Sequence, residues 1–238
     1  MGRTRSQILQ WESKWSVPTG LATFACVILV IAAAVVISSV SGSGEAGILT
    51  AAHEHSSDIT ASAVLEGIGF ALMAAPLYFL FRAASSRSDR MRRQLVGLVI
   101  IAPLFFALST VLNAAATNEA ADQFAAGEAK STLSVAEASK ECTEERKEEG
   151  AKEFAESHEA SGKTPQQDCV DTKRADDEAE NALTDASLRG AATGFGLAGR
   201  LGLAVALFYS CLYGMRTGLL SRFWGSLGMA LGVAALLL

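Results

Sequence analysis

Apolar residues gather in four long, almost charge-free runs and a shorter fifth, with polar stretches between them. A helix that crosses about 30 Å of hydrocarbon needs about 20 apolar residues, because lipid offers its backbone no hydrogen-bond partner. The pattern therefore predicts an all-α fold, an integral membrane bundle of four to five transmembrane helices. The runs cover residues 18–40, 60–81, 94–115, 191–215 and 223–238.

The fifth run, from Phe223 to Leu238, is the shortest. As a helix it would be about 24 Å long, which is less than a full crossing. We expect the natural chain to continue past Leu238; the alternative is a short or re-entrant helix. For the first run the alternative is a cleaved signal peptide, which a length above about 15 apolar residues disfavours.

Charge divides the chain in the same way as hydrophobicity. Residues 116–189, here called the insert, hold 19 acidic and 9 basic residues, a net charge of −10, while the rest carries +5. This local acidity argues against nucleic acid as a partner. Four parts result: an N-terminal segment (1–17), transmembrane helices 1–3 (18–115), the insert, and transmembrane helices 4–5 (190–238).

Lysine and arginine content of the short loops predicts the orientation. One side carries ten basic residues, whereas the opposite short loop, residues 41–59, carries none. We therefore expect a multi-pass plasma-membrane protein with a cytoplasmic N-terminus and an extracellular insert. The ten are Arg3, Arg5, Lys14, Arg82, Arg87, Arg90, Arg92, Arg93, Arg216 and Arg222.

The insert is rich in alanine and glutamate, which favour helices, and poor in large apolar side chains. We expect a helical insert with mobile parts and without an independent core; disorder is the alternative. Its first part is expected to continue the third membrane helix. Its last part, DTKRADDEAENALTDASLRG, is expected to run without a break into the fourth.

Cys142 and Cys169 are the two cysteines of the insert, and on the oxidising side of a membrane we expect them to form a disulfide. A helix over residues 143–160 would carry the chain about 27 Å away from Cys142. The eight residues SGKTPQQD reach back about as far only when fully extended. Either that segment doubles straight back or the helix breaks at Gly150. Cys26 and Cys211 lie in apolar runs and are expected to be buried.

Glu66 and Arg200 are the charges within the membrane runs. They lie about 9 Å and 13 Å below the outer ends of their helices. A lone charge in hydrocarbon is costly, so we predict an intramembrane ion pair between them. The pair is either a clamp between helices or, alternatively, a substrate, ion or proton site.

His53, His55 and Asp58 form a weak candidate for a divalent metal site or a pH response in the loop before the second run. The favoured interpretation is that these residues belong to a solvated loop, so no metal or cofactor is expected. The GFGLAG motif at Gly194, Gly196 and Gly199 matches a dinucleotide pattern, but it lies in a membrane run and not after a strand. Instead, a set of glycines in the last two runs is expected to let helices approach closely: Gly190, Gly194, Gly199, Gly202, Gly228 and Gly232.

The segment RTGLLSRFWGSLGMALG, residues 216–232, is similar to uncharacterised actinobacterial multi-pass membrane proteins of the domain-of-unknown-function type. LYFLFRA, residues 77–83, resembles them more weakly. The resemblance implies a bacterial integral membrane protein, and it carries no catalytic residue over to this chain.

These patterns favour a non-enzymatic accessory, envelope or partner-binding protein whose insert is the interaction surface for a protein partner. The alternative is a small transporter or channel component built around Glu66 and Arg200. The glycine-rich fourth and fifth helices could also support an oligomer.

Overall fold

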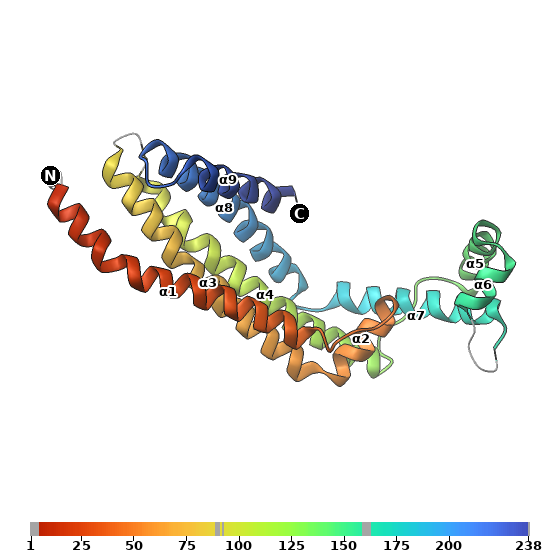
Figure 1. The fold of residues 1–238 in the computed structure, drawn as a ribbon. Coiled ribbons are helices and arrows are strands. Elements are labelled where there is room, and N and C mark those ends of the chain that lie inside the picture. Colours follow the sequence, from red (N-terminus) through yellow and green to blue (C-terminus); the bar gives the residue numbers. More distant parts are fainter. Residues whose placement is uncertain (1–4, 89–90, 92, 159–162, 238) are drawn as a thin grey trace. The chain divides into compact units, whose positions relative to one another are not determined.

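The computed structural model describes residues 5–88, 91, 93–158 and 163–237, which form nine α-helices and no strand (Figure 1). The all-α prediction is confirmed for these residues. The elements are α1 (Arg5–Ile37), α2 (Gly44–Glu54), α3 (Ser56–Arg87), the 3-10 helix η1 (Arg93–Leu95), α4 (Val96–Ala125), α5 (Val135–Glu149), α6 (Ala151–Ser157), α7 (Pro165–Asp185), α8 (Arg189–Arg216) and α9 (Arg222–Leu237).

Four helices, α1, α3, α4 and α8, are long and apolar enough to cross a membrane. They have 28 to 33 residues, and each begins or ends outside its apolar run. The run marks only the hydrocarbon-compatible part, whereas the helix continues through polar helix-forming residues on either side. The fifth run forms α9, whose 16 residues make it shorter than the other four. The expected continuation past Leu238 lies outside the described residues.

The chain divides into two compact units. Unit 1 consists of residues 1–37, 60–114 and 190–238, and unit 2 of residues 38–59 and 115–189. The insert therefore forms most of unit 2, as its charge and composition suggest. The loop before the second apolar run, which has no lysine or arginine, also belongs there, because it contains α2, which packs against α7 of the insert.

Unit 1 has its core where α3, α4 and α8 meet. Leu77 and Phe81 of α3, Val99 and Ala102 of α4 and Leu203 of α8 are buried together. In contrast, α1 leaves a series of large apolar side chains exposed, as expected of a helix that faces lipid. These are Leu21, Phe24, Val27, Ile28, Ile31 and Val35.

Glycines let the helices of unit 1 approach closely, as the sequence predicts for some of them. A Cβ atom added at Gly199 would lie 2.6 Å from the backbone nitrogen of Phe106 on α4, and one at Gly228 would clash with Cys211 Sγ on α8. Gly202 and Gly232 make similar contacts. These glycines pack within the chain, whereas a Cβ atom at Gly190 or Gly194 would meet nothing within 4 Å.

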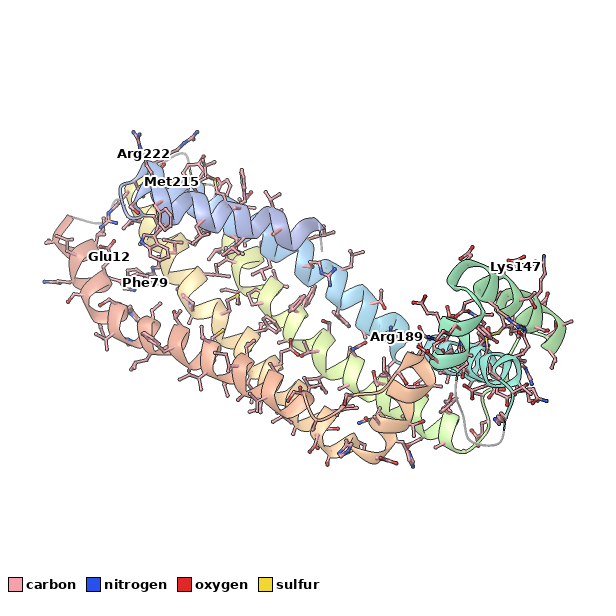
Figure 2. The ribbon with its side chains drawn as sticks, turned by 45° about the vertical axis from the view of Figure 1, so that its right-hand side comes forward. Glu12, Phe79, Lys147, Arg189, Met215 and Arg222 are labelled. Carbon is pink, nitrogen blue, oxygen red and sulfur yellow. A yellow bond between two sulfur atoms is a disulfide. The ribbon has the colours of Figure 1, made fainter. Side chains whose placement is uncertain are left out.

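One end of unit 1 joins α1 to α3 through aromatic and charged side chains. Trp11 stacks on Phe79 with 5.4 Å between ring centroids, and the Arg82 guanidinium lies 4.8 Å from the Trp11 ring. Arg87 Nη2 donates to Glu12 Oε2 at 2.7 Å. Figure 2 shows Glu12 and Phe79 at this end of the unit, with Met215 and Arg222 nearby.

Candidate functional site

Unit 2 is held together by a small core around a disulfide. Cys142 of α5 and Cys169 of α7 are bonded, with their Cα atoms 6.0 Å apart. Both sulfurs are buried, together with the Phe154 side chain of α6, and Val170 packs against them. The predicted disulfide is therefore confirmed. The expectation that the insert has no core of its own is wrong, because the disulfide brings these few apolar residues together.

Gly150 provides a helix break between Cys142 and Cys169. Helix α5 ends at Glu149, and α6 begins at Ala151. Between them Gly150 has φ 92° and ψ 150°, a backbone conformation that residues with a side chain rarely adopt. Of the two routes that the spacing allows, the chain takes the break at Gly150. Phe154 can then pack onto the disulfide one turn later.

Local sequence signals set the starts of the two longest helices of the insert. Ser134 accepts from the backbone nitrogen of Glu137 while the Glu137 carboxylate accepts from that of Ser134, and Thr164 and Gln167 repeat this capping box on α7. Pro165 follows Thr164 at the first helical position, where a missing N–H costs nothing. Hydrogen bonds to Ser134 hold the pKa of the Glu137 carboxyl below its usual value.

Asp177 ties the loop before α5 to α7. Its Oδ2 accepts from the backbone nitrogens of Thr132 at 2.6 Å and Leu133 at 3.0 Å, and from Ser131 Oγ at 2.8 Å. These bonds, led by the one from Leu133, lower the pKa of Asp177 because they favour the charged carboxylate. One side chain thereby fixes three successive residues of a loop that has no helix of its own.

The neighbouring residue, Asp176, holds α2. Its Oδ1 accepts from the backbone nitrogen of Ala46 at 2.9 Å. Ser43 precedes α2 but makes no side-chain cap, so a residue 130 positions away supplies it. Gly44 makes room, because its φ is +71° and a Cβ atom there would lie 2.6 Å from the Asp176 carboxylate. The sequence offers no local signal for this cap beyond the three glycines of SGSGEAG.

The histidines before the second apolar run do not converge on one site. His53 Nδ1 lies 2.9 Å from Asp122 Oδ1 on α4, whereas His55 Nδ1 lies 3.4 Å from Asp58 Oδ2. Both histidines are about half exposed. His53 and His55 thus have different partners, on α4 and α3 respectively. The three residues His53, His55 and Asp58 therefore do not form a three-ligand group.

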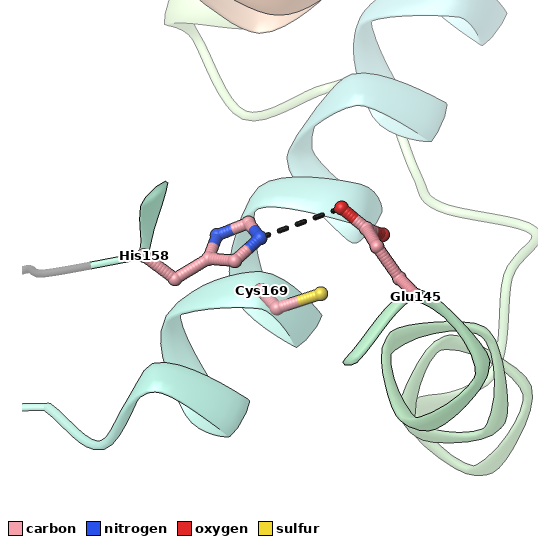
Figure 3. Close-up of side chains that lie close together, drawn as sticks. All are labelled: Glu145, His158 and Cys169. Carbon is pink, nitrogen blue, oxygen red and sulfur yellow. Dashed lines mark ion pairs between the residues drawn. The ribbon is translucent and has the colours of Figure 1, made fainter. Parts of the chain in front are cut away.

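A second cluster of ligand-type side chains lies beside the disulfide (Figure 3). His158 follows α6, and its Nε2 lies 3.5 Å from Glu145 Oε1, while its Nδ1 lies 3.8 Å from Asp168 Oδ2. Glu145 Oε2 lies 2.9 Å from Lys173 Nζ. The hydrogen bond from Lys173 is the main reason why the pKa of Glu145 is lowered. Ligand atoms of Glu145, His158 and Cys169 all lie within 4.8 Å of one another.

Glu66 on α3 and Arg200 on α8 are both half-buried in unit 1, and among the described residues no ion pair joins them. Their positions along the bundle can be compared through their neighbours on α4. Gly67, next to Glu66, packs against Ala107 and Thr110, whereas Gly199, next to Arg200, packs against Ala102 and Phe106. An offset of four to five residues along α4 corresponds to about 6–8 Å. A long arginine side chain can cover such a distance, so the pairing stays a prediction.

The link between the insert and the fourth membrane helix differs from the prediction. The continuous helix expected there is wrong, because α7 ends at Asp185 and α8 begins at Arg189. At this break Glu119 Oε2, on α4, accepts from the backbone nitrogen of Ser187 at 3.1 Å and from its hydroxyl at 2.8 Å. The residues Ala-Ser-Leu contain no glycine or proline that would mark the break in the sequence.

Exposed carboxylates on α5 complete the description of unit 2. Glu141, Glu144 and Glu148 are exposed and spaced by three and four residues, which places them on one helix face.

Comparison of the chain with protein-family models, curated proteins and solved structures finds no match. The described residues belong to an all-helical protein with four helices long enough to span a membrane and an acidic unit that contains a disulfide.

Proposed function

We propose that the protein is a multi-pass plasma-membrane protein that presents unit 2 outside the cell as a binding surface for a protein partner. The main support for this proposal is that covalent and hydrogen-bonded links fix the helices of the insert to one another. A disulfide, two capping boxes and the Asp176 and Asp177 contacts hold segments from three parts of the chain in fixed positions. A pre-organised surface loses less entropy on binding than a flexible tail would.

The orientation rests on the charge bias of the short loops. Ten basic residues against none favour a cytoplasmic N-terminus, which puts residues 41–59 and the insert on the same, outer side. A disulfide in unit 2 agrees with this orientation, because disulfides persist in oxidising compartments.

The acidic face of α5 indicates the chemistry of the partner. Glu141, Glu144 and Glu148 are exposed on one helix face of an insert with a net charge of −10. A partner with a basic surface complements it, and the attraction speeds association and weakens as salt is added.

Charge reversal on this face tests the proposal. Full-length protein with Glu141→Lys, Glu144→Lys and Glu148→Lys is crosslinked in intact cells, and the partner recovered with the wild-type chain is quantified. We expect this triple variant to lose it. A matched control, Glu180→Lys with Asp185→Lys, changes exposed carboxylates on α7 and should retain the partner. Equal recovery with all three chains would contradict the α5 surface.

A transporter or channel component is the second candidate, favoured by the half-buried charges Glu66 and Arg200 in helices of membrane-spanning length. It makes the opposite prediction. Changing Glu66 to Gln and Arg200 to Met would abolish its activity, whereas changing the α5 face would not.

A further inference from the structure

We propose that the dithiol form of unit 2 binds one zinc ion through Cys142 Sγ, Cys169 Sγ, His158 Nε2 and Glu145 Oε1. This site goes beyond the proposed binding function and does not depend on it. In the disulfide form the two sulfurs are bonded to each other, so neither is available as a thiolate, and the cluster cannot act as a metal site.

The four ligand atoms come together from three helical segments. Glu145 lies three residues after Cys142, which puts both on one face of α5. Cys169 faces them from α7, and His158 reaches in from the end of α6. The Cα atoms of the cysteines are 6.0 Å apart, so both thiolates can reach one ion with Zn–S bonds of about 2.3 Å.

Distances within the cluster suit a tetrahedral ion. Zinc bonds of about 2.0–2.2 Å to nitrogen and oxygen place these two ligands about 3.3–3.6 Å apart. His158 Nε2 and Glu145 Oε1 are 3.5 Å apart, which is too long for a good hydrogen bond but suits two ligands of one ion. Cys169 Sγ lies within 4.8 Å of a ligand atom of each of these two residues.

Outer groups already orient the ligands. Asp168 Oδ2 lies 3.8 Å from His158 Nδ1, beyond hydrogen-bond length, and its negative charge favours a proton on Nδ1, which leaves the Nε2 lone pair for the ion. Lys173 Nζ binds Glu145 Oε2 at 2.9 Å and leaves Oε1 for the ion. Two thiolates, one carboxylate and Zn²⁺ sum to −1, and the Lys173 ammonium offsets this charge.

The switch between the forms has a defined chemistry. A dithiol reductant gives two electrons and two protons to the Cys142–Cys169 bond, which breaks, and the reductant becomes a disulfide. Zinc then displaces the two thiol protons into solvent as two Zn–S bonds form. The ion would replace the disulfide as the link between α5 and α7. Four protein ligands with both sulfurs fully buried describe a structural site and not a catalytic one.

Cobalt is the probe for the test, since a tetrahedral Co²⁺–thiolate site absorbs in the near ultraviolet and visible. Full-length protein in detergent is reduced with a phosphine and titrated with Co²⁺, and Zn²⁺ is then added to displace it. We expect one equivalent to bind to the reduced chain and none to the oxidised chain. His158→Gln should lose the tetrahedral spectrum. Asp168→Asn, which alters only the outer partner, should weaken zinc binding by about 10- to 100-fold.

Two controls keep the test decisive. His53→Gln with His55→Gln leaves the four ligands in place and should bind cobalt like the wild type. His158→Gln should still form the Cys142–Cys169 disulfide when oxidised, which shows that it folds. The proposal is overturned if the reduced wild-type chain binds no cobalt, if a Cys142→Ser, Cys169→Ser chain binds it equally well, or if the His53 and His55 changes remove binding.

Discussion

Asp176 Oδ1 accepts a hydrogen bond from the backbone nitrogen of Ala46 at 2.9 Å, across 130 positions of sequence. The contact places a carboxylate at the N-terminus of α2, where unpaired N–H groups and the helix dipole favour negative charge. It makes the segment before the second apolar run part of the same unit as the insert.

We therefore expect Asp176→Ala to loosen α2, at a cost of about 1 kcal/mol, as for the loss of other N-terminal caps. Hydrogen exchange of residues 44–54 in the full-length protein should become faster. Asp176→Asn can still accept the bond and should stay close to the wild type. Asp185→Ala removes an exposed carboxylate from the end of the same helix and should have no effect on α2.

Asp177 should make the loop of residues 131–133 sensitive to acid. Its pKa is lowered in the folded protein by the bonds from Leu133, Ser131 and Thr132. Its stabilising effect is thus complete above the unfolded-state pKa of about 3.9 and is lost as the pH falls through the lower folded-state value. The protection of the Leu133 amide, which is its exchange rate relative to the intrinsic rate at the same pH, should fall over that acidic range. In Asp177→Ala, which has no acceptor, the Leu133 amide should already be poorly protected at neutral pH, without an acid step.

Gly150→Ala should destabilise the disulfide core, because a φ of 92° with ψ 150° costs a residue with a side chain about 1–3 kcal/mol. The expected result is a lower unfolding temperature of unit 2 and slower closure of the disulfide after reduction. Gly190→Ala is the control, because a Cβ atom there would meet nothing within 4 Å. Equal behaviour of the two variants would show that the break at Gly150 is not needed.

Glu66 and Arg200 provide a test of coupling within unit 1. If they interact, Glu66→Gln and Arg200→Met should each lower thermal stability in detergent, and the double variant should lose less than the sum. We expect a coupling energy of about 0.5–3 kcal/mol. Additive losses would mean that the two side chains act independently, and would leave each charge to be explained by a separate polar environment.

The apolar runs predicted the four long helices well because lipid enforces a simple rule: every backbone group must bond within its own helix. Helix ends were less predictable, since α1 begins at Arg5, before its run, and α3 extends to Arg87, beyond its run. The length and hydropathy of an apolar run predict which residues could lie in hydrocarbon, but they do not predict the residue at which the helix ends.

In unit 2, contacts between residues that are distant in the sequence were harder to predict than local structure. Chain geometry narrowed the route from Cys142 to Cys169 to two possibilities, and one of them, the break at Gly150, is the observed one. The docking of α2 was not predicted, because besides Leu49 it depends on Asp176 and on buried alanines, which give only a weak hydrophobic signal. Ala52 and Ala179 are fully buried, although a search for large apolar residues passes over both.

Cysteine labelling tests the proposed orientation, in which unit 2 lies outside the cell and the basic end of unit 1 lies inside. Exposed positions Glu128 and Ser86 are changed to cysteine one at a time, with Cys26 and Cys211 replaced by serine. Cys142 and Cys169 remain bonded and do not react. With an impermeant maleimide on intact cells, we predict labelling of Glu128→Cys and labelling of Ser86→Cys only after permeabilisation. The reverse pattern would show that the proposed orientation is wrong.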